Sequence, residues 1–363
     1  MRILVVNAGS SSLKLSLLDD GSTEAAENLP VSRGQFEPAA VASVLGRIGG
    51  DTADAVGHRV VHGGRQFVEA VQLDTAVRKK LDDLVDLAPL HQPKSLAGID
   101  AVSQVLPGVP AVACFDTAFH AGMPAAAATY ALPPEWRKRW ELRRYGFHGL
   151  SHAYATRRSG ELLGYVPERL VVCHLGSGAS LAAVRNGRSV DTTMGFTPLE
   201  GLVMGTRSGT VDPGLVLWLA EHAHTPLAEL AATLEYRSGL LGLAGTSDMR
   251  EVLTRAAGGD SAARLALEVY LHRLRGLIAS MAAALGGLDT LVFTGGVGEH
   301  AAEIRARAAN GLGFLSVAVD EGRNARADGD TDITACGTAV RAFVVAARED
   351  IEIARQVREV LRR

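Results

Sequence analysis

Near the N-terminus, two short apolar runs flank a turn of small polar residues. Residues 3–6 are apolar, residues 7–12 form the turn, and residues 13–18 are again mostly apolar before Asp19-Asp20-Gly21 ends the pattern. Two apolar runs joined by a short turn are typical of a β-hairpin. The sequence therefore predicts a hairpin over residues 3–18 whose first strand is buried.

The same pattern returns in the middle of the chain. Residues 170–187 again contain an apolar run, a Gly/Ser turn and a second apolar run, and they end on an Asn-Gly pair, which is typical of a tight hairpin turn. Shifted by 167 positions, Gly9 falls on Gly176, and the serines that follow them also coincide. Two unrelated hairpins would look similar, but a spacing of nearly half the chain favours two similar domains, each with one hairpin.

Helices and single strands are predicted around these hairpins. We expect helices at 77–87, 214–234, 261–285 and 338–361, and buried strands at 111–115 and 290–294. The chain is expected to cross into its second domain just after Asp116, and its last helix is expected to pack back onto the first domain. Residues 22–50 show no clear pattern, and residues 135–145 are rich in Trp and Arg.

Composition narrows the class of protein. The 363 residues are 47% hydrophobic, 21% charged and 5% aromatic, which is ordinary for a globular protein of about two domains. A formal net charge of −3 provides no basic surface for nucleic acid or an anionic membrane. No stretch reaches 18 apolar residues, so a cytoplasmic protein is expected. Cys114, Cys173 and Cys336 are odd in number and lie in apolar runs, and we expect reduced core residues.

Three glycine-rich turns each follow an apolar run, at 7–12, 174–180 and 294–299. Glycine lets the backbone approach a phosphate, and successive N–H groups can form a concave anion site. Any one of these segments alone could be a tight turn without a ligand. Together they favour a nucleotide held between two domains.

Other glycine and serine motifs point to different classes of enzyme. The chain has no Gly-x4-Gly-Lys-Ser/Thr and is not a P-loop enzyme. Residues 296–301 fit the looser G-x-G-x-x-A fingerprint of a dinucleotide-binding domain, with Asp320 about 20 residues on. This alternative explains neither of the other two turns. Ser11-Ser12-Leu13-Lys14 has the S-x-x-K pattern of β-lactamases, but the Lys-Thr-Gly that accompanies it is missing.

Zinc is an unlikely metal for this chain. His58/His62 and His148/His152 are spaced as i, i+4 pairs but lack the glutamate of a metalloprotease helix.

Charged residues in glycine-flanked motifs are candidates for the site of a phosphoryl transfer between two anions. Such a reaction joins two anions, so it needs a divalent metal, carboxylates that hold the metal, and arginines. The candidates are Arg59 in Gly57-His-Arg-Val-Val-His-Gly-Gly64, Asp116, His148, and Arg207 in Met204-Gly-Thr-Arg-Ser-Gly209. A single arginine is more often a solvated surface charge, and a lone histidine is more often structural. The glycine and apolar context of these residues favours a functional role.

Five motifs, in order along nearly the whole chain, resemble the signatures of acetate kinases. They are Asn7-x-Gly-Ser-Ser-Ser-x-Lys14, Gly57-His-Arg-Val-Val-His-Gly-Gly64, Leu87-Ala-Pro-Leu-His91, Met194-Gly-Phe-Thr-Pro-Leu-Glu-Gly201 and Met204-Gly-Thr-Arg-Ser-Gly209. That family belongs to the acetate and sugar kinase, Hsp70 and actin superfamily.

The resemblance implies an α/β fold with two duplicated actin-like, ribonuclease H-like domains and a nucleotide cleft between them. The N-terminal domain would comprise 1–117 plus about 351–363, and the nucleotide-binding C-terminal domain 118–350.

The resemblance also implies the function and the cofactor. The chain would transfer the γ-phosphoryl of ATP to acetate, reversibly and by direct in-line attack, giving acetyl phosphate and ADP. Mg²⁺, or Mn²⁺ in its place, would be required, and the enzyme would be a cytoplasmic homodimer that serves acetyl-CoA biosynthesis. Propionate or butyrate is the alternative substrate within the family. An NAD-dependent dehydrogenase and a non-transferring actin- or Hsp70-type ATPase are the alternatives from other classes.

Site residues follow from the same resemblance. The implied catalytic residues are Arg59, His91, Asp116, His148 and Arg207. Arg59 would also bind substrate, together with Val61, Leu90, Phe147 and Pro198, and the implied metal-site residues are Asn7 and Glu349. The implied ATP-binding residues are Asn7, Ser10, Ser12, Lys14, His174, Gly176, Ser177, Gly178, Asp248, Met249, Arg250, Gly295, Gly296, Val297, Gly298 and His300.

Three positions depart from the family pattern. Ser177, His300 and Arg348 each stand where an asparagine is expected. A serine is shorter than asparagine and offers a hydroxyl in place of an amide, so the second glycine loop can meet phosphates differently from the first.

Overall fold

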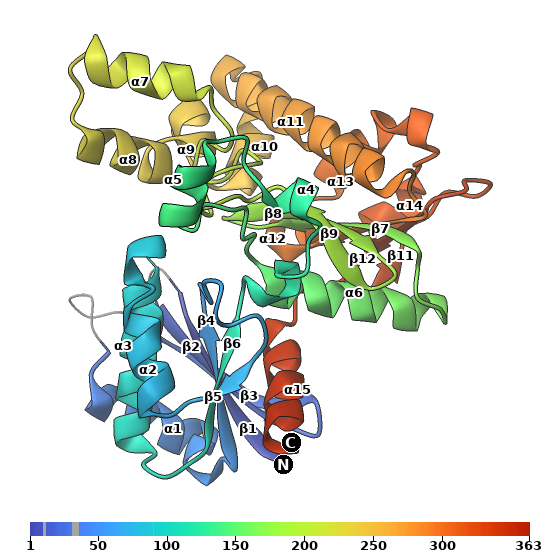
Figure 1. Ribbon diagram of the computed structural model, residues 1–363. Coiled ribbons are helices and arrows are strands. Elements are labelled where there is room, and N and C mark those ends of the chain that lie inside the picture. The colour runs from blue at the N-terminus through green and yellow to red at the C-terminus, as the bar shows by residue number, and fades with distance from the viewer. Residues whose placement is uncertain (10–11, 31–35, 90) are drawn as a thin grey trace. The chain divides into compact units, whose positions relative to one another are not determined.

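The computed structural model describes residues 1–9, 12–30, 36–89 and 91–363 (Figure 1). Tertiary contacts divide the chain into two compact units. Unit 1 comprises Met1–Ala121, Phe147–Tyr154 and Arg348–Arg363, and unit 2 comprises Gly122–Gly146 and Ala155–Ala347.

A six-stranded mixed sheet forms the centre of unit 1. In spatial order its strands are β3 (Ser22–Pro30), β2 (Ser12–Asp19), β1 (Arg2–Ala8), β4 (Ala55–Val60), β6 (Ala111–Phe115) and β5 (Val71–Gln72). β1 pairs antiparallel with β2 from Arg2–Asp19 to Ala8–Leu13, which confirms the predicted hairpin. β4 and β6 run parallel to β1.

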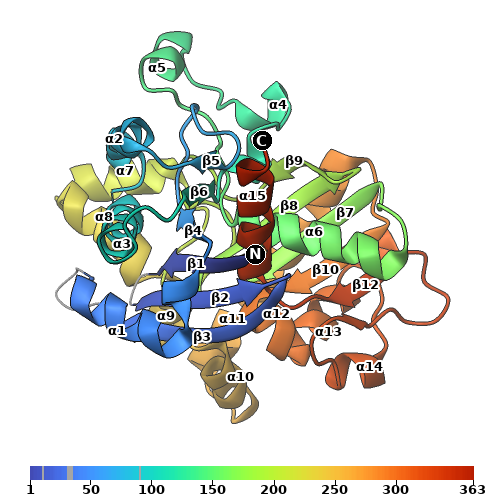
Figure 2. The same cartoon turned by 90° about the horizontal axis from the view of Figure 1, so that it is seen from below.

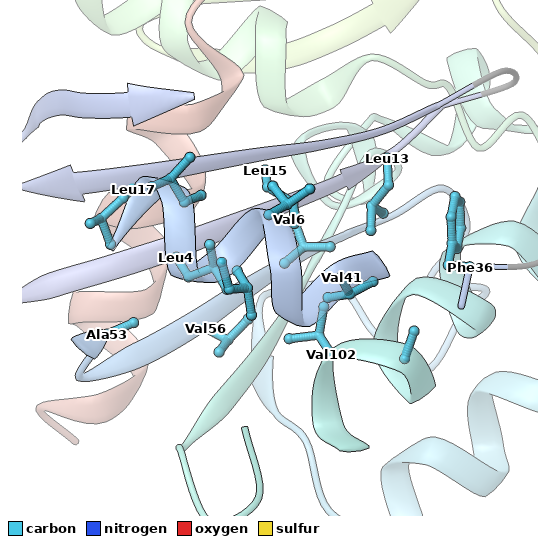
Figure 3. Packing of buried hydrophobic residues seen from close by; sticks show 14 of the residues in the cluster. Leu4, Val6, Leu13, Leu15, Leu17, Phe36, Val41, Ala53, Val56 and Val102 are labelled. Carbon is cyan, nitrogen blue, oxygen red and sulfur yellow. The ribbon is translucent and has the colours of Figure 1, made fainter. Parts of the chain in front are cut away.

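Both faces of β1, β4 and β6 are mostly buried, which explains why these strands are largely apolar without alternation. Leu4 and Val6 pack with α1 (Pro38–Ile48) and α3 (Gln92–Val105) on one face, as Figure 3 shows for part of this cluster. Ile3 and Val5, which alternate with them, pack on the other face.

The C-terminal helix α15 (Glu349–Leu361), red in Figure 2, covers the second face of this sheet. A Cβ at Gly57 would lie 2.5 Å from Ile353 of α15, so the close contact between helix and strand requires glycine. Residues Arg348–Arg363, which include α15, belong to unit 1.

Three helical predictions need correction at their boundaries. The helix predicted at 77–87 is α2 (Thr75–Asp82) followed by a 3₁₀ turn, Val85–Leu87, because two aspartates at the end of α2 oppose its dipole. The helix predicted at 214–234 is divided into α7 (Pro213–Glu221) and α8 (Leu227–Tyr236), because Pro226 cannot continue α7 and instead precedes α8. Part of the segment predicted as a helix at 338–361 is strand β12 (Arg341–Val344).

Unit 2 repeats the sheet of unit 1. Its strand order is β9 (Arg188–Thr192), β8 (Ala179–Arg185), β7 (Arg169–Leu175), β10 (Thr290–Thr294), β12 and β11 (Thr331–Asp332). β7 is antiparallel to β8 and parallel to β10, and β12 is parallel to β10. The shift of 167 positions maps β1 onto β7 residue by residue. The predicted duplication and the α/β fold class are confirmed.

The predicted helix at 261–285 is confirmed as α11 (Ser261–Leu285). Asp260 accepts hydrogen bonds from the N–H groups of Ala262 and Ala263 at its start, and Gly286 with a φ of 71° ends it. α11 packs on β7 and β8.

The remaining helices contain between 4 and 15 residues. They are α4 (Ala125–Ala128), α5 (Pro134–Arg139), α6 (Gly149–Leu163), α9 (Gly239–Ala244), α10 (Met249–Ala257), α12 (Gly295–His300), α13 (Ala302–Asn310) and α14 (Glu321–Ala325), with 3₁₀ turns at Gly50–Thr52, Ala118–His120 and Gly313–Leu315. No helix in the described part of the chain is long and apolar enough to cross a bilayer.

The cysteine prediction holds at two of its three positions. Cys114 and Cys173 are buried, whereas Cys336 is exposed. Cys336 lies in the connection between β11 and β12 and not in the core.

Candidate active site

A buried ion pair lies where two parallel strands of unit 1 end. Arg59 comes from β4 and Asp116 directly follows β6, so the parallel ladder brings their side chains together. The Nη2 of Arg59 donates to Oδ2 of Asp116 at 2.6 Å, and its Nε donates to Oδ1 at 3.1 Å. Asp116 is 1% exposed. This two-point contact fixes the plane of the guanidinium group.

Asn7 and Glu349 complete a charged cluster with this pair. The Nη1 of Arg59 donates to Oδ1 of Asn7 at 3.0 Å, and Nδ2 of Asn7 donates to Oε2 of Glu349 at 3.1 Å. Glu349 is the first residue of α15 and lies 3.9 Å from the Nε of Arg59. Four residues that are far apart in the sequence therefore form one network at one end of the sheet.

The network stabilises the charged form of Arg59. Burial lowers its pKa, but the carboxylates of Asp116 and Glu349 outweigh that effect and raise the pKa above its ordinary value. Burial raises the pKa of Asp116, and the attraction of Arg59 opposes that rise. Arg59 is thus a permanent cation whose position is set by its partners.

His148 is joined to this cluster through the backbone. The N–H of Gly149 donates to the carbonyl oxygen of Asp116 at 2.8 Å, and a Cβ at position 149 would lie 2.2 Å from that oxygen. His148 itself has a φ of 57°, in the left-handed region. The turn that carries His148 is therefore held against Asp116, and only glycine can follow it.

Several histidines of unit 1 are neutral structural groups. The Nδ1 of His62 accepts the N–H of Gly64 at 2.9 Å, and Nε2 of His120 lies 3.1 Å from the carbonyl oxygen of Phe147. Burial lowers the pKa of each to about 4. His91 directly precedes α3 and is followed by Gln92. The side chain of Gln92 accepts the N–H of His62 and donates to the carbonyl oxygen of His62, both at 3.1 Å.

The other N-terminal candidates lie on or beside the first hairpin and β4. Lys14 is an exposed residue of β2 and pairs in register with Asn7, while Ser12 begins β2. Val61 and Phe147 are buried in unit 1. Ser10 and Leu90 lie outside the described residues.

Arg207 is fixed within unit 2 by a residue that was absent from the predicted site. The Nε of Arg207 donates to Oε1 of Glu235 at 2.6 Å, and its Nη1 donates to the carbonyl oxygen of Pro198 at 3.3 Å. The Glu235 side chain is only 9% exposed. The pair orients Arg207 beside Pro198, a predicted substrate-binding residue.

A pocket of about 440 Å³ opens in unit 2. Eight predicted nucleotide-binding residues line it. They are Gly176, Ser177, Asp248, Met249, Arg250, Gly296, Val297 and His300. The volume lies within the usual range for small-ligand pockets. The pocket is bordered by segments that the sequence separates by more than 100 residues.

The predicted residues around this pocket come from three places. The 176–178 turn closes the β7–β8 hairpin, where the N–H of Gly176 donates to the carbonyl oxygen of Gly178 at 3.1 Å. Asp248 caps α10 by accepting the N–H of Arg250 at 2.9 Å. His174 of β7 pairs in register with Thr294, the last residue of β10. Gly295 follows Thr294 and has a φ of 78° at the start of α12.

The structure differs from two interpretations of the glycine motif at 294–301. The 294–299 segment is not an open turn, because α12 begins directly after β10. Asp320 ends no strand. It caps α14 by accepting the N–H of Arg323 at 2.8 Å, and this removes the acidic strand end that the dinucleotide fingerprint requires.

The charged cluster of unit 1 offers oxygen donors that suit a hard divalent cation. No group of three or more His, Cys, Asp and Glu side chains that could hold a metal occurs in the described ranges. Asn7 and Glu349 instead offer hard oxygen donors, and the Glu349 side chain is 18% exposed, so its carboxylate can be reached from solvent. Mg²⁺ typically takes one or two protein oxygens and completes its shell with water and phosphate.

Comparison with known proteins assigns the family. The sequence model of the acetokinase family matches residues 47–355. The chain belongs to the acetokinase family.

Full-length relatives agree with this assignment. The chain is 47% identical to an acetate kinase of Leifsonia xyli subsp. xyli, over 98% of this chain and 97% of that one. Among solved structures, an acetate kinase of Porphyromonas gingivalis superposes with a TM-score of 0.91 at 36% identity, covering 99% of each chain. A propionate kinase of Francisella tularensis gives a TM-score of 0.93 at 36% identity, again over 99% of each chain. The resemblance seen in the five motifs is thus confirmed for the family and the fold.

Three structural residues were missed by the motifs. Glu235 pairs with Arg207, Tyr270 of α11 lines the pocket, and Arg305 is buried beneath α12. Glu235 and Tyr270 lie on helices with ordinary sequence patterns, so no local signal distinguishes them. Arg305 is one of many arginines, and only its burial in the fold makes it unusual.

Proposed function

We propose that this member of the acetokinase family transfers the γ-phosphoryl group of ATP to acetate, giving acetyl phosphate and ADP, and catalyses the reverse reaction. The observation that carries the proposal is the buried Arg59–Asp116 pair, joined to Asn7 and Glu349, in a chain 47% identical to an acetate kinase. A fixed guanidinium group suits a reaction that brings a carboxylate to a phosphate.

Arg59 and Arg207 are proposed to neutralise the two reacting anions. Each guanidinium group is oriented by a carboxylate, Asp116 in one case and Glu235 in the other, with N–O distances of 2.6 Å. Because the partners hold the groups before substrate arrives, little reorganisation is needed when charge develops on the transferring phosphoryl group. His148, held beside Asp116, is proposed to donate a hydrogen bond to an equatorial oxygen of that group.

No general base is required in this mechanism. A carboxylate is already ionised at neutral pH, so its oxygen can attack phosphorus directly. The transfer is proposed to be in line, through a loose transition state and without a covalent enzyme intermediate. Positioning and charge neutralisation then supply most of the acceleration.

Asn7 and Glu349 are proposed to hold Mg²⁺, which would supply positive charge against the phosphate oxygens. The nucleotide is proposed to occupy the pocket of about 440 Å³ in unit 2, with Ser177, Asp248 and His300 among the residues that contact it.

Propionate or butyrate is the alternative substrate, because a propionate kinase superposes on this chain with a TM-score of 0.93. One methylene group changes binding in an apolar pocket by only about 1–3 kcal/mol. The candidate apolar residues are Val61, Phe147 and Pro198.

The test is to trap acyl phosphate as hydroxamate with ATP, Mg²⁺ and each of acetate, propionate and butyrate. We expect product with acetate and a loss of at least about 100-fold in Arg207→Ala. Product from none of the three acids would refute the proposed activity. Faster turnover of propionate or butyrate than of acetate would select the alternative substrate.

A homodimer is also proposed, and α7 and α8 are its candidate contact. Leu217 is 63% exposed, Trp218 53% and Leu227 73%. Exposed apolar residues grouped on neighbouring helices are typical of association surfaces. Sedimentation should show a dimer that Leu217→Glu dissociates, and a monomeric wild-type protein would refute this. Cytoplasmic location and a role in acetyl-CoA biosynthesis stay predictions.

A further inference from the structure

The chain leaves unit 2 through three consecutive anchored residues. The N–H of Val345 donates to the carbonyl oxygen of Phe293 at 2.9 Å, and that of Ala346 to Oδ1 of Asp330 at 3.0 Å. The last of the three, Ala347, donates to Oε1 of Glu299 at 3.0 Å. A side chain of α12 therefore holds the final residue of unit 2.

The same helix borders the pocket of unit 2. Gly296, Val297 and His300 of α12 line the pocket, and Glu299 lies between them on a short helix. The hydrogen bond of Glu299 therefore links the helix that borders the pocket to Ala347.

The buried guanidinium group of Arg305 holds the C-terminal end of α12 through hydrogen bonds. Arg305 is 1% exposed and donates to the carbonyl oxygens of Gly298 and Glu299 at 2.9 and 2.7 Å. It also donates to the side-chain and backbone oxygens of Asn324, both at 2.7 Å. Burial lowers the pKa of Arg305 because these acceptors are all uncharged. The end of α12 is thus well defined, so that Glu299 is presented to Ala347 in one position.

Directly after Ala347, the chain enters the charged cluster of unit 1. Arg348 donates to Oγ1 of Thr23 at 2.6 Å and to Oδ1 of Asp350 at 3.0 Å. Glu349 follows, and it accepts the hydrogen bond from Asn7. Only Arg348 lies between Ala347, the partner of Glu299, and Glu349, a carboxylate of the proposed metal site.

We propose that Glu299 is a positioning residue that couples occupancy of the nucleotide pocket to the placement of Glu349, through its hydrogen bond to Ala347. The proposal rests on the proposed function, because it assigns the pocket to the nucleotide and Glu349 to the reacting centre. The bond joins the pocket helix to the chain segment that delivers Glu349, so its loss uncouples the two without emptying the pocket.

The experiment compares Glu299→Ala with Glu299→Gln and with Glu303→Ala. Alanine removes the acceptor for the Ala347 N–H, whereas glutamine keeps an oxygen in its place. Glu303 is a matched control, because it is a glutamate of the next helix, α13, and pairs with Arg307 on the surface at 3.1 Å.

Two measurements separate coupling from local support. Calorimetry gives the Kd of MgADP, and the hydroxamate assay gives kcat/KM for acetate at saturating ATP. For Glu299→Ala we expect a Kd within about threefold of wild type and a kcat/KM at least about tenfold lower, the range of typical coupling energies. Glu299→Gln should recover most of the activity, and Glu303→Ala should resemble wild type.

Hydrogen–deuterium exchange tests the coupling without turnover. MgADP should slow exchange of the backbone amides at 348–352 in the wild type and in Glu299→Gln, but not in Glu299→Ala. Equal protection in Glu299→Ala overturns the proposal. It is also overturned if alanine and glutamine variants fall equally in activity, or if Glu299→Ala loses nucleotide affinity to the same degree. A wild type that makes no acyl phosphate but shows the protection pattern would refute the proposed function alone.

Discussion

The two sheets of the molecule have the same strand order, but equivalent positions carry different chemistry. In unit 1, Val6 pairs with His58, and His58 with Ala113. In unit 2, the corresponding row is Cys173, Phe293 and Val344. Counting onward from these rows, Asn7 corresponds to His174, Arg59 to Thr294 and Asp116 to Ala347.

This correspondence shows how a duplicated fold can divide two tasks. At the ends of its strands, unit 1 places an amide, a guanidinium group and a carboxylate that bind one another. Unit 2 places a histidine, a threonine and an alanine at the equivalent positions, and Gly176 and Gly296 just beyond the first two line the pocket of about 440 Å³. The first arrangement supplies fixed charge, and the second supplies space and backbone donors.

The difference extends to the backbone ladder. The N–H of Asp116 donates to the carbonyl oxygen of Val60 at 3.0 Å, as a parallel sheet requires. At the equivalent position, the N–H of Ala347 donates to the side chain of Glu299. The chain of unit 2 has already turned into α12 at this level, so a carboxylate replaces the missing backbone acceptor.

The largest effect is expected when unit 1 loses the guanidinium group of Arg59, which unit 2 lacks at the equivalent position. We expect Arg59→Ala to lower kcat by about 10²–10³-fold, as for loss of one fixed donor at a developing charge. It should also destabilise the fold by about 3–5 kcal/mol, because Asp116 is left as a buried charge without its partner. Acyl phosphate assays and urea unfolding measure the two effects.

The Arg59→Ala/Asp116→Asn double variant is the control for this prediction. It should recover much of the stability and none of the activity. Recovery of activity in the double variant would show that the pair is structural.

A smaller effect is expected at the arginine of unit 2. Glu235→Ala should lower kcat/KM for the carboxylate substrate by about 100-fold, since hydrogen bonds to charged groups contribute about 1.5–3 kcal/mol. Glu235→Gln keeps an acceptor near the Nε of Arg207 and should lose only about tenfold. Steady-state kinetics at varied concentrations of the carboxylate substrate measure kcat/KM. If both variants are as active as wild type, Glu235 does not contribute to the site.

The sequence predicts what is local in these two regions. Both hairpins follow from apolar runs and glycine turns, and α11 follows from its pattern and its Asp260 cap. Arg59 and Asp116 stand out because glycine and apolar residues surround them. Residues in short motifs can thus be found before their partners are known.

Long-range contacts could not be predicted from the same patterns. β12 exists because Arg341–Val344 pairs with β10, about 50 residues earlier, and its own sequence also suits a helix end. Glu235 pairs with Arg207 across 28 residues, and Arg305 becomes buried only when α12 and α14 pack around it. In each case the decisive neighbour is supplied by the tertiary fold.

His58 offers a comparison of stability, since its equivalent in unit 2 is Phe293. Burial lowers the pKa of His58 to about 3, with Asp100 opposing the shift, and its Nε2 has no hydrogen-bond partner among the described residues. The unfolded chain has an ordinary histidine pKa of about 6.5, so it binds more protons than the fold below that pH. Acidification through this window therefore destabilises the fold.

We expect His58→Leu to reduce this loss. Between pH 7 and pH 5, the free energy of unfolding should fall by about 2 kcal/mol less in the variant than in wild type. The raised pKa of Asp116 acts in the opposite sense, and burial of His62 and His120 in the same sense, but all three are common to both proteins and cancel. Parallel pH dependence in urea unfolding would contradict the assignment of His58 as a buried neutral group.

The smallest effect is expected at the turn of the second hairpin, at Ser177, where the motif resemblance predicts an asparagine. Ser177 is exposed and lines the pocket, while its carbonyl oxygen accepts the N–H of Gly205 at 3.0 Å. Because this backbone bond holds the turn, the side chain can change without moving it. Ser177→Asn adds a longer amide donor and should tighten MgADP binding by up to about tenfold, one additional hydrogen bond.

Calorimetry with Ser177→Ala as the matched variant shows whether the Ser177 side chain contributes to MgADP binding. Alanine should weaken MgADP binding by less than about fivefold, because only one solvent-exposed hydroxyl is removed. The KM for acetate should stay constant in both variants, since Ser177 lies in unit 2 and contacts no residue of the Arg59 cluster among the hydrogen bonds of the described chain. A change in the KM for acetate without a change in the Kd for MgADP would contradict the division of tasks between the two units.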